Sequence, residues 1–394
     1  MNYINLSSKI INDKYTEFVF ESFDIQNKEE TKVSIPINFG ECKTFDWNIG
    51  VIYGGSGTGK TTLLTQFGNI EKINFDSEKA LISNFDWLEP NEATMLLSAI
   101  GLSSVPTWLR PFHTLSNGEQ YRAELAYKIG KAKENEVVLI DEYTSVVDRD
   151  VAKSMSYALQ KYIRKYNKKI VLASCHFDIM EWLMPDWTYS PLKGRVEKHD
   201  YRLSSKPKIE LSLFRCRYET WNIFKQHHYL SADLNKAANT YVILLNEKPV
   251  AFIAILPFPH GNIKNGYRIS RIVILPDFQG LGLGSKLCDY ISSLYFKENR
   301  TMYIKTSNPA LWKYFKNSEN WLLCSEFNKE DLNSDKLEKM KKANDTGGFR
   351  NAITKSYKWI GFKSIDDTSI IKFKSEIYKD VAQNQISIFD VIDN

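Results

Sequence analysis

Residues 54–61 read Gly54-Gly55-Ser56-Gly57-Thr58-Gly59-Lys60-Thr61, and this stretch organises the first half of the chain. It follows a short apolar run, residues 49–53, that predicts a buried strand, and it precedes a helical pattern over residues 62–67. A glycine-rich loop between a strand and a helix is typical of the phosphate-binding pattern G-x-x-x-x-G-K-[ST]. The glycines let backbone N–H groups close on phosphate oxygens, and the following helix directs its positive end at the anion.

Two side chains of the loop carry the expected chemistry. The Lys60 ammonium reaches the β- and γ-phosphates of a bound nucleotide, and the Thr61 hydroxyl ligates Mg²⁺. A glycine-rich turn with a chance lysine is the alternative interpretation. We set it aside because every position of the pattern is matched in the strand–loop–helix context that the pattern requires.

The composition is that of a chain able to form several ordinary domains. It has 394 residues, 43% of them hydrophobic, which suffices for two or three domains. There is no stretch of about 18 apolar residues, and residues 1–9 lack the apolar centre of a signal peptide. The five cysteines lie far apart without a C-x-x-C pair, which argues against a disulfide framework or a zinc site. These features predict a cytoplasmic protein with reduced thiols and no membrane partner.

The net charge of +5 is unevenly distributed. Residues 1–200 carry 23 basic and 27 acidic residues, whereas residues 201–394 carry 29 basic and 20 acidic residues. A basic second half favours a polyanionic partner such as a nucleic acid. A lysine-rich solvated surface explains the same excess equally well.

Further segments follow the glycine loop in a definite order. Residues 115–120 read LSNGEQ and precede a helix-forming run over residues 121–133. Residues 137–142 read VVLIDE, which predicts a buried strand that presents two carboxylates at its end. After a short turn at residues 145–148, a second buried strand is expected at residues 170–173, and His176 lies just beyond it.

This order resembles ABC-type ATPases, over residues 15–198. The matching segments are the phosphate loop at residues 54–61, the signature motif at 115–119, the Walker B strand at 137–142, the D-loop at 145–148 and the switch histidine at His176. The signature departs from L-S-G-G-Q at Asn117 and Glu119. A core histidine at a strand end is the alternative for His176, but its position after Walker B favours the switch role.

The resemblance implies a role for each matched residue. Asp141 supports Mg²⁺, Glu142 polarises the attacking water and His176 contacts the γ-phosphate. The ATP-binding residues are then Gly54, Gly55, Ser56, Gly57, Thr58, Gly59, Lys60, Thr61, Thr62, Ser116, Gly118 and Asp148. Ser116 and Gly118 contact ATP held by a second subunit, because a signature helix cannot reach the glycine loop of its own chain in this fold. One such domain per chain therefore implies a head-to-tail homodimer closing on two ATP molecules.

Parts of this domain depart from the family pattern. The interval from Lys60 to Ser116 is short, which predicts a trimmed helical subdomain. Asn84 stands where a glutamine is expected after a predicted strand at residues 79–83. Both departures argue against coupling to a transmembrane partner.

The two ends of the domain give weaker signals. Residues 18–23 and 33–37 alternate and predict an antiparallel flap beside the nucleotide, with Tyr15 or Phe18 stacking on adenine. Residues 181–205 contain Pro185 and Pro191 among tryptophans and predict a hinge region before the second domain, with an added edge strand at residues 192–199.

A second glycine-rich stretch organises the later part of the chain. Residues 268–275 predict a strong strand, and the sequence then reads Gln279-Gly280-Leu281-Gly282-Leu283-Gly284-Ser285 before an amphipathic helix over residues 286–296. Dinucleotide sites use similar glycines, but they need a parallel strand–helix–strand unit opening the domain. Here the loop comes only after several predicted strands, which favours a different anion-binding site.

This loop resembles that of the GNAT acetyltransferase superfamily, and the following strand, helix and strand at residues 302–305, 309–316 and 321–327 also fit. The resemblance implies that Gln279, Gly280, Leu281, Gly282, Leu283, Gly284 and Ser285 bind the pyrophosphate of acetyl-CoA, largely through backbone N–H groups. A strand irregularity near Ile274 is expected to free an N–H for the thioester carbonyl.

Acyl transfer to an amine needs a base for the incoming amine and an acid for the departing thiolate. Tyr314 lies on the helix where many GNAT enzymes place the acid. His227 and His228 are candidate bases or substrate contacts. A packing aromatic and a surface histidine pair are the respective alternatives.

Two segments suggest partners. Residues 336–358 mix lysines with aromatic residues, which suits phosphate contact and base stacking, although a solvated loop fits equally. Gln385–Phe389 resembles the Q-L-[SD]-L-F peptide by which bacterial and phage proteins bind the sliding clamp, with Ile386 and Ile388 in place of leucines. Such a tail orders only on binding, and pentapeptides also recur by chance.

The sequence thus predicts an α/β protein of two domains and a tail. Residues 1–203 form a P-loop ABC-type nucleotide-binding domain with a mixed sheet, residues 208–375 form an α/β GNAT fold, and residues 376–394 form the tail. The expected ligands are ATP, Mg²⁺ and acetyl-CoA.

ATP-gated acetylation of a nucleic-acid amine is the favoured function. A loose resemblance to the Mom-type phage enzymes that modify DNA bases, through residues 227–230 and Ser270-Arg271, points the same way. Two alternatives stay open: an acyltransferase for a protein or small molecule with ATP as regulator, and a non-catalytic ABC-type switch that binds DNA or ribosomes.

Overall fold

The computed structural model describes residues 2–23, 29–201, 208–228, 233–259, 261, 263–327, 354–361 and 371–374. The chain divides into two compact units. The first unit contains Met1–Asn74 and Tyr127–Ser205, and the second contains Phe75–Ala126 and Lys206–Asn394. Residues 75–126 therefore fold with the C-terminal part, whereas the sequence boundaries group them with the N-terminal domain. In the described ranges, no helix has the length and apolar character needed to cross a bilayer.

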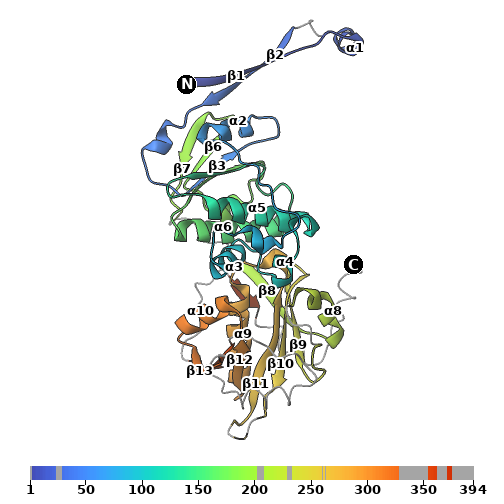
Figure 1. The fold of residues 1–394 in the computed structure, drawn as a ribbon, viewed down its shortest axis with the longest axis vertical. Helices are drawn as coiled ribbons and strands as arrows, with labels where there is room; N and C mark the ends of the chain where they lie inside the picture. The colour runs from blue at the N-terminus through green and yellow to red at the C-terminus, as the bar shows by residue number, and fades with distance from the viewer. Residues whose placement is uncertain are drawn as a thin grey trace. The chain divides into compact units, whose positions relative to one another are not determined.

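A five-stranded sheet forms the centre of the first unit (Figure 1). The strands are β3 (Ile49–Tyr53), β4 (Val137–Ile140), β5 (Lys169–Ser174), β6 (Trp187–Ser190) and β7 (Arg195–Lys198), in the order β4-β5-β3-β6-β7. The pairings among β4, β5, β3 and β6 are parallel, and β7 pairs antiparallel with β6. Parallel sheets are covered on both faces, which is why β3 is buried along its whole length. Three helices follow these strands: α2 (Lys60–Leu64), α6 (Arg149–Lys165) and α7 (Met180–Leu183).

Trp187 corrects one expectation from the sequence. Residues 181–205 were expected to form a hinge, but β6 pairs with β3 and the Trp187 side chain is fully buried. Its ring fills the space above Gly50, where an added Cβ would lie 2.0 Å from the indole. Residues 187–198 therefore belong to the sheet of the first unit, and β7 at its edge confirms the strand expected at residues 192–199.

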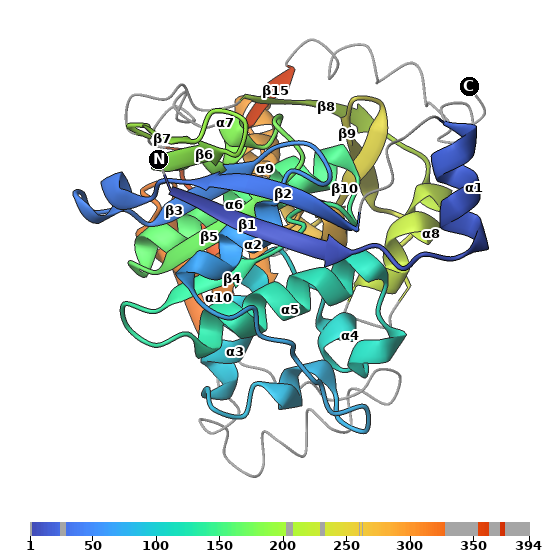
Figure 2. The ribbon, with the colours of Figure 1, turned by 90° about the horizontal axis from the view of Figure 1, so that it is seen from above.

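A hairpin arm precedes this sheet. β1 (Asn2–Lys9) pairs antiparallel with β2 (Glu30–Ile37), and α1 (Lys14–Ser22) lies at the far end of the hairpin (Figures 1 and 2). The strand expected at residues 18–23 is wrong, because Asp13 and Thr16 form a capping box that begins a helix there.

The position of the arm also shows that Tyr15 and Phe18, the two residues expected to stack on adenine, lie far from the glycine loop. Ile35 packs on the glycine loop, and Tyr15 and Phe18 lie on α1 beyond the opposite end of β2. Five residues of strand separate Glu30 from Ile35, about 17 Å at the usual rise. Neither aromatic ring therefore lies beside the loop.

The second unit contains an eight-stranded sheet in the order β13-β14-β12-β11-β10-β9-β8-β15. The strands are β8 (Ile209–Arg215), β9 (Asn239–Leu245), β10 (Lys248–Pro257), β11 (Gly266–Ile274), β12 (Thr301–Thr306), β13 (Trp321–Phe327), β14 (Thr354–Trp359) and β15 (Ile371–Lys374). The later helices are α8 (Trp221–Phe224), α9 (Leu283–Lys297) and α10 (Pro309–Asn317). This is the mixed α/β arrangement expected for the GNAT part.

Residues 75–126 add a small helical segment to this unit. It contains α3 (Pro90–Ala99), α4 (Val105–Trp108) and the start of α5 (Asn117–Lys131), which continues into the first unit. The strand expected at residues 79–83 is wrong: Leu81–Asn84 forms a short 3-10 helix. The Asn84 side chain holds this turn, accepting from the Asp76 N–H and donating to the Ala80 carbonyl.

Candidate functional site

The first glycine loop joins β3 to α2, as the sequence predicts. Gly57 and Gly59 have φ values of 75° and 85°, a region that disfavours other residues. A Cβ at Gly59 would lie 2.3 Å from the Ile35 side chain, so the loop and the arm fit only with glycine there. The Lys60 ammonium donates to the Gly55 carbonyl at 2.6 Å and closes the loop on itself.

Two acidic residues follow β4 in a sharply turned backbone. The Glu142 N–H donates to Asp141 Oδ1 at 2.9 Å. Glu142 has φ 48° and Thr144 has φ 70°, and such left-handed geometry at non-glycine residues is often found at functional sites. Tyr143 between them is fully buried and anchors the turn.

His176 is tied to this turn. Its Nδ1 lies 3.1 Å from the Thr144 hydroxyl, and its backbone N–H donates to the Ser174 hydroxyl. Ser174 in turn donates to the Tyr143 carbonyl, and its own carbonyl accepts from the Gly54 N–H. The Walker B turn, the histidine and the start of the glycine loop therefore form one hydrogen-bonded network.

The pKa of His176 lies below its usual value. Burial lowers the pKa, the Arg149 charge lowers it further, and Asp178 opposes both. The imidazole is therefore neutral at physiological pH and can either donate to or accept from a phosphate oxygen.

The donor set of this region fits a nucleotide-bound Mg²⁺. Across the described residues there is no cluster of three His, Cys, Asp or Glu side chains that could hold a metal by itself. Mg²⁺ bound with a nucleotide takes most of its ligands from phosphates and water, so one hydroxyl and one carboxylate suffice. Thr61 is the second residue of α2 and Asp141 directly follows β4, and their side chains offer suitable oxygen ligands.

Two further predicted ATP residues, Thr62 and Asp148, lie in the first unit. Thr62 lies on α2, half-buried. Asp148 caps α6, and its carboxylate accepts from the Asp150 and Val151 N–H groups. The N-cap pattern, an aspartate before a long amphipathic helix, is visible in the sequence, but our interpretation did not use it.

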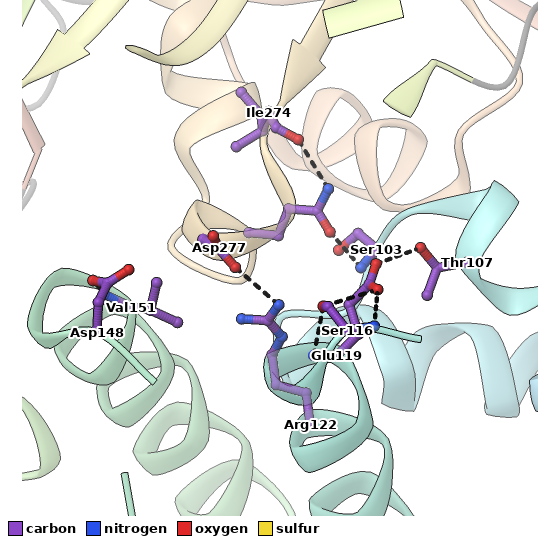
Figure 3. A network of polar contacts seen from close by, with 10 residues as sticks. Ser103, Thr107, Ser116, Glu119, Arg122, Asp148, Val151, Ile274 and Asp277 are labelled. Atoms are coloured by element: carbon purple, nitrogen blue, oxygen red, sulfur yellow. Dashed lines mark hydrogen bonds and ion pairs between the residues drawn. The ribbon is translucent and has the colours of Figure 1, made fainter. Parts of the chain in front are cut away.

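The signature residues Ser116 and Gly118 lie at the start of α5 in the second unit. Ser116 donates to the Glu119 carboxylate through both its N–H and its hydroxyl, each at 3.0 Å, and the Thr107 hydroxyl donates to Glu119 at 2.9 Å (Figure 3). Burial raises the pKa of Glu119, but these hydrogen bonds outweigh it and the net pKa is lowered. Glu119, a departure from the family pattern, is thus an ionised, buried partner of the signature serine.

The second glycine loop joins β11 to α9. Gly280 and Gly282 have φ values of 83° and 81°, and a Cβ at Gly282 would meet open space. The Ser285 hydroxyl donates to the Gly282 carbonyl at 2.9 Å and closes the first turn of α9. The first N–H groups of this 15-residue helix have no partner within the helix by geometry, so the loop fits a pyrophosphate.

β11 has the irregular geometry expected of the acyl site, but at another position. The irregularity was expected near Ile274, yet the register shift falls between Ala254 and Ile255, opposite Ser270. Ile274 itself pairs with Ala251. On its other side β11 pairs with β12 only as far as Ile269↔Ile304. Among the described residues, β11 therefore has no pairing with β12 beyond Ile269.

Tyr314 makes a contact that the sequence did not indicate. Its hydroxyl donates to the buried Asp289 on α9, which also accepts from the Trp321 indole at 2.8 Å. Burial raises the pKa of Asp289, and burial together with the Asp289 hydrogen bond raises the pKa of Tyr314. Serving as the acid therefore requires the hydroxyl to turn from Asp289 toward the leaving sulfur.

We expect Tyr314→Phe to lower the free energy of unfolding by about 1–3 kcal/mol, because a buried carboxylate loses one of its donors. Urea denaturation measures this change. Tyr290→Phe on α9 is the control, since its ring keeps the stacking contact with Phe373. An unchanged stability for Tyr314→Phe would contradict a stabilising hydrogen bond between Tyr314 and Asp289. A loss of acyltransferase activity, together with an altered alkaline limb of the pH–rate profile, would assign the acid role to Tyr314.

The candidate bases lie after α8. His228 packs against the edge of Trp221, with ring centroids 5.6 Å apart. Burial lowers the pKa of His227, against the attraction of Glu119 and Asp277. Most of the basic segment 336–358, and the whole of Gln385–Phe389, lie outside the described residues.

Known proteins resemble the N-terminal and the C-terminal part of the chain separately. Residues 206–318 match the model of the acetyltransferase (GNAT) family. Among curated proteins no match is found. The later part of the chain therefore contains a segment that matches the acetyltransferase (GNAT) family, and the N-terminal region contains a mainly parallel sheet with a glycine loop between β3 and α2.

Solved structures show similarity to each part. An ATP-binding cassette, dimeric in a post-hydrolysis state with ADP and Pi, is 17% identical, with TM-score 0.33, over 44% of this chain and 93% of that one. The Bacillus subtilis acetyltransferase in complex with CoA is 13% identical, with TM-score 0.29, over 39% and 98%. The IAA acetyltransferase from Bacillus cereus is 12% identical, with TM-score 0.29, over 38% and 98%.

Proposed function

We propose that the chain is an acyl-CoA-dependent N-acyltransferase gated by an ABC-type ATPase. The observation that carries the proposal is the pair of glycine loops. Each follows a strand of its unit, has glycines with positive φ and opens a helix, at Lys60 in one case and Leu283 in the other. Two such loops in one chain fit two pyrophosphate-bearing ligands, ATP and acetyl-CoA.

The ATPase half needs positioning and charge neutralisation more than covalent help. Lys60 neutralises the β- and γ-phosphates, Thr61 and Asp141 hold Mg²⁺, and Glu142 orients the attacking water. The network through Ser174 supports this proposal, since it ties His176 to the turn that carries Glu142. A head-to-tail homodimer brings Ser116 and Gly118 of one subunit to the ATP of the other.

The acyltransferase half joins the amine to the acyl group. The amine nitrogen attacks the thioester carbonyl, a C–N bond forms and the C–S bond breaks. The amine proton goes to a base, for which we propose His228, and the thiolate takes a proton, for which we propose Tyr314. Acetyl-CoA supplies the activated acyl group when bound to residues 279–285.

We assign the acceptor amine to a nucleic acid. The excess of basic over acidic residues in residues 201–394, 29 against 20, supports a polyanionic substrate. Closure of the ATP dimer then admits or positions this substrate.

The test is incubation with labelled acetyl-CoA, ATP and a panel of DNA, RNA and protein. We expect label to be transferred to a nucleic acid in an ATP-dependent manner, with retention on that nucleic acid falling steeply with salt. Label on protein alone, or no transfer despite acetyl-CoA binding, contradicts the proposal.

Gly282→Val tests the second loop directly. Valine disfavours φ 81° and fills the open space above the loop, so we expect acetyl-CoA affinity to fall by about tenfold or more. Gly261→Val is the matched control, because a Cβ there also meets open space and the residue lies in the turn between β10 and β11. Calorimetric titration with acetyl-CoA measures both, and equal affinities would place the coenzyme elsewhere.

A further inference from the structure

Residues 101–122 connect the signature motif to the second glycine loop within the second unit. The Ser103 N–H donates to the Gln279 side-chain oxygen, and the Gln279 amide donates to the Ile274 carbonyl at 2.9 Å. Gly101, with φ 91°, lies so close that a Cβ there would be 3.3 Å from the Gln279 carbonyl oxygen. The first residue of the acyl-CoA loop is therefore held between this segment and the end of β11.

Arg122 forms a second link. Its side chain is 2% exposed, and one guanidinium nitrogen lies 3.0 Å from the carboxylate of Asp277, two residues before Gln279 (Figure 3). Among the described residues the Arg122 Nε has no hydrogen-bond partner. The Asp277 side chain is 51% exposed, so the pair joins a buried guanidinium to a carboxylate at the surface, and Asp277 is the counter-charge of Arg122.

The signature serine, Ser116, directly precedes α5, the helix that contains Arg122. Six residues separate Ser116 from Arg122, about 9 Å along a helix axis. Ser116 is fixed by Glu119, and Glu119 by Thr107 of α4. A ligand that replaces Glu119 as the partner of Ser116 therefore acts on the helix that also holds Asp277.

We infer that Arg122 is a positioning residue of the acyl-CoA loop and that it couples acyl-CoA binding to ATP engagement at the signature. The inference rests on the proposed function and adds its regulation. A γ-phosphate at Ser116 replaces Glu119 as the partner of this serine, and Arg122 and Ser103 transmit the change to Asp277 and Gln279. The ATP-bound dimer then presents the acyl-CoA loop in the conformation that binds acyl-CoA more tightly. By linkage, acyl-CoA raises the affinity for ATP by the same factor.

The experiment measures acetyl-CoA affinity by calorimetry in full-length Glu142→Gln protein, without nucleotide and with saturating MgATP. We expect MgATP to tighten acetyl-CoA binding by roughly fivefold or more. Adding Arg122→Met should bring this ratio to about one, because the link between α5 and Asp277 is then removed. A purely structural role for Arg122 would instead weaken both states equally.

Two variants complete the test. Lys131→Met removes an exposed positive charge of the same helix, near Tyr127, and should leave the ratio unchanged. Arg122→Met with Asp277→Asn should be no worse than Arg122→Met alone, because the two residues act as one pair. Thermal unfolding will show whether Arg122→Met is folded. If it is not, the double variant Arg122→Met with Asp277→Asn, which leaves no unpaired charge, is used in its place.

The outcomes separate this inference from the proposed function. If both ligands bind but MgATP leaves acetyl-CoA affinity unchanged, the coupling is wrong and the proposed function stands. If the ratio persists in Arg122→Met, Arg122 is not the positioning residue. If neither ligand binds, the proposed function fails and the inference fails with it.

Discussion

Glu142→Gln is expected to lower kcat for ATP hydrolysis by about 10²–10⁴-fold, the usual contribution of a positioned general base. An amide cannot polarise or deprotonate the attacking water. The turn that presents residue 142 should survive, because it is held by the buried Tyr143 and by the Thr144–His176 contact rather than by the Glu142 side chain. Lys60 and Asp141 are unchanged, so ATP binding should persist.

The measurement is phosphate release together with light scattering. Because ATP binds but is not hydrolysed, the variant should accumulate as a dimer in MgATP. Glu134→Gln, an exposed glutamate before β4, is the control and should hydrolyse ATP at the normal rate. A Glu142→Gln protein that hydrolyses normally would remove Glu142 from the proposed site.

The glycine loops could be predicted from the sequence because their requirement is local. A loop that closes between a strand and a helix with positive φ at Gly57, Gly59, Gly280 and Gly282 has few sequence solutions. The strand that ends in Asp141 was equally clear, since four apolar residues before two carboxylates describe a buried strand with an exposed end. Residues 139 and 140 are buried as expected.

The errors have local and long-range causes. At residues 18–23 the alternating pattern predicted a strand, but the capping box at Asp13 begins a helix that extends through most of these residues. The prolines around Trp187 suggested a hinge, but burial of the indole against Gly50 holds that segment in the sheet.

The contacts around the acyl-CoA loop could not be predicted for a different reason. Arg122 and Asp277 are 155 residues apart, and Ser103 and Gln279 are 176 apart. Each residue taken alone is typical of a surface. Only the packing of residues 75–126 in the second unit brings them together.

Asp186→Ala is expected to destabilise the first unit by about 3–5 kcal/mol, because it breaks a buried ion pair from one side. The Asp186 carboxylate accepts from the Asn48 and Ile49 N–H groups, each at 2.8 Å, and pairs with Arg164 at 2.9 Å. The two side chains are 11% and 12% exposed. Alanine leaves two backbone donors without this acceptor and a guanidinium without its counter-charge, at the entrance to β3. Domains are stable by only about 5–15 kcal/mol, so much of the fold's margin is lost.

The loss reaches the ATP site through β3, which leads directly into the glycine loop. Urea unfolding monitored by tryptophan fluorescence should report it, since Trp187 follows Asp186 in the core. Asp186→Asn keeps an oxygen for the backbone donors and should lose less stability than alanine. Asp46→Ala removes a 94% exposed carboxylate 3.5 Å from Lys169 and should leave stability unchanged, as exposed pairs contribute little. Equal stabilities for Asp186→Ala and Asp46→Ala would show that burial of the Arg164 pair does not hold α6 and the start of β3 together.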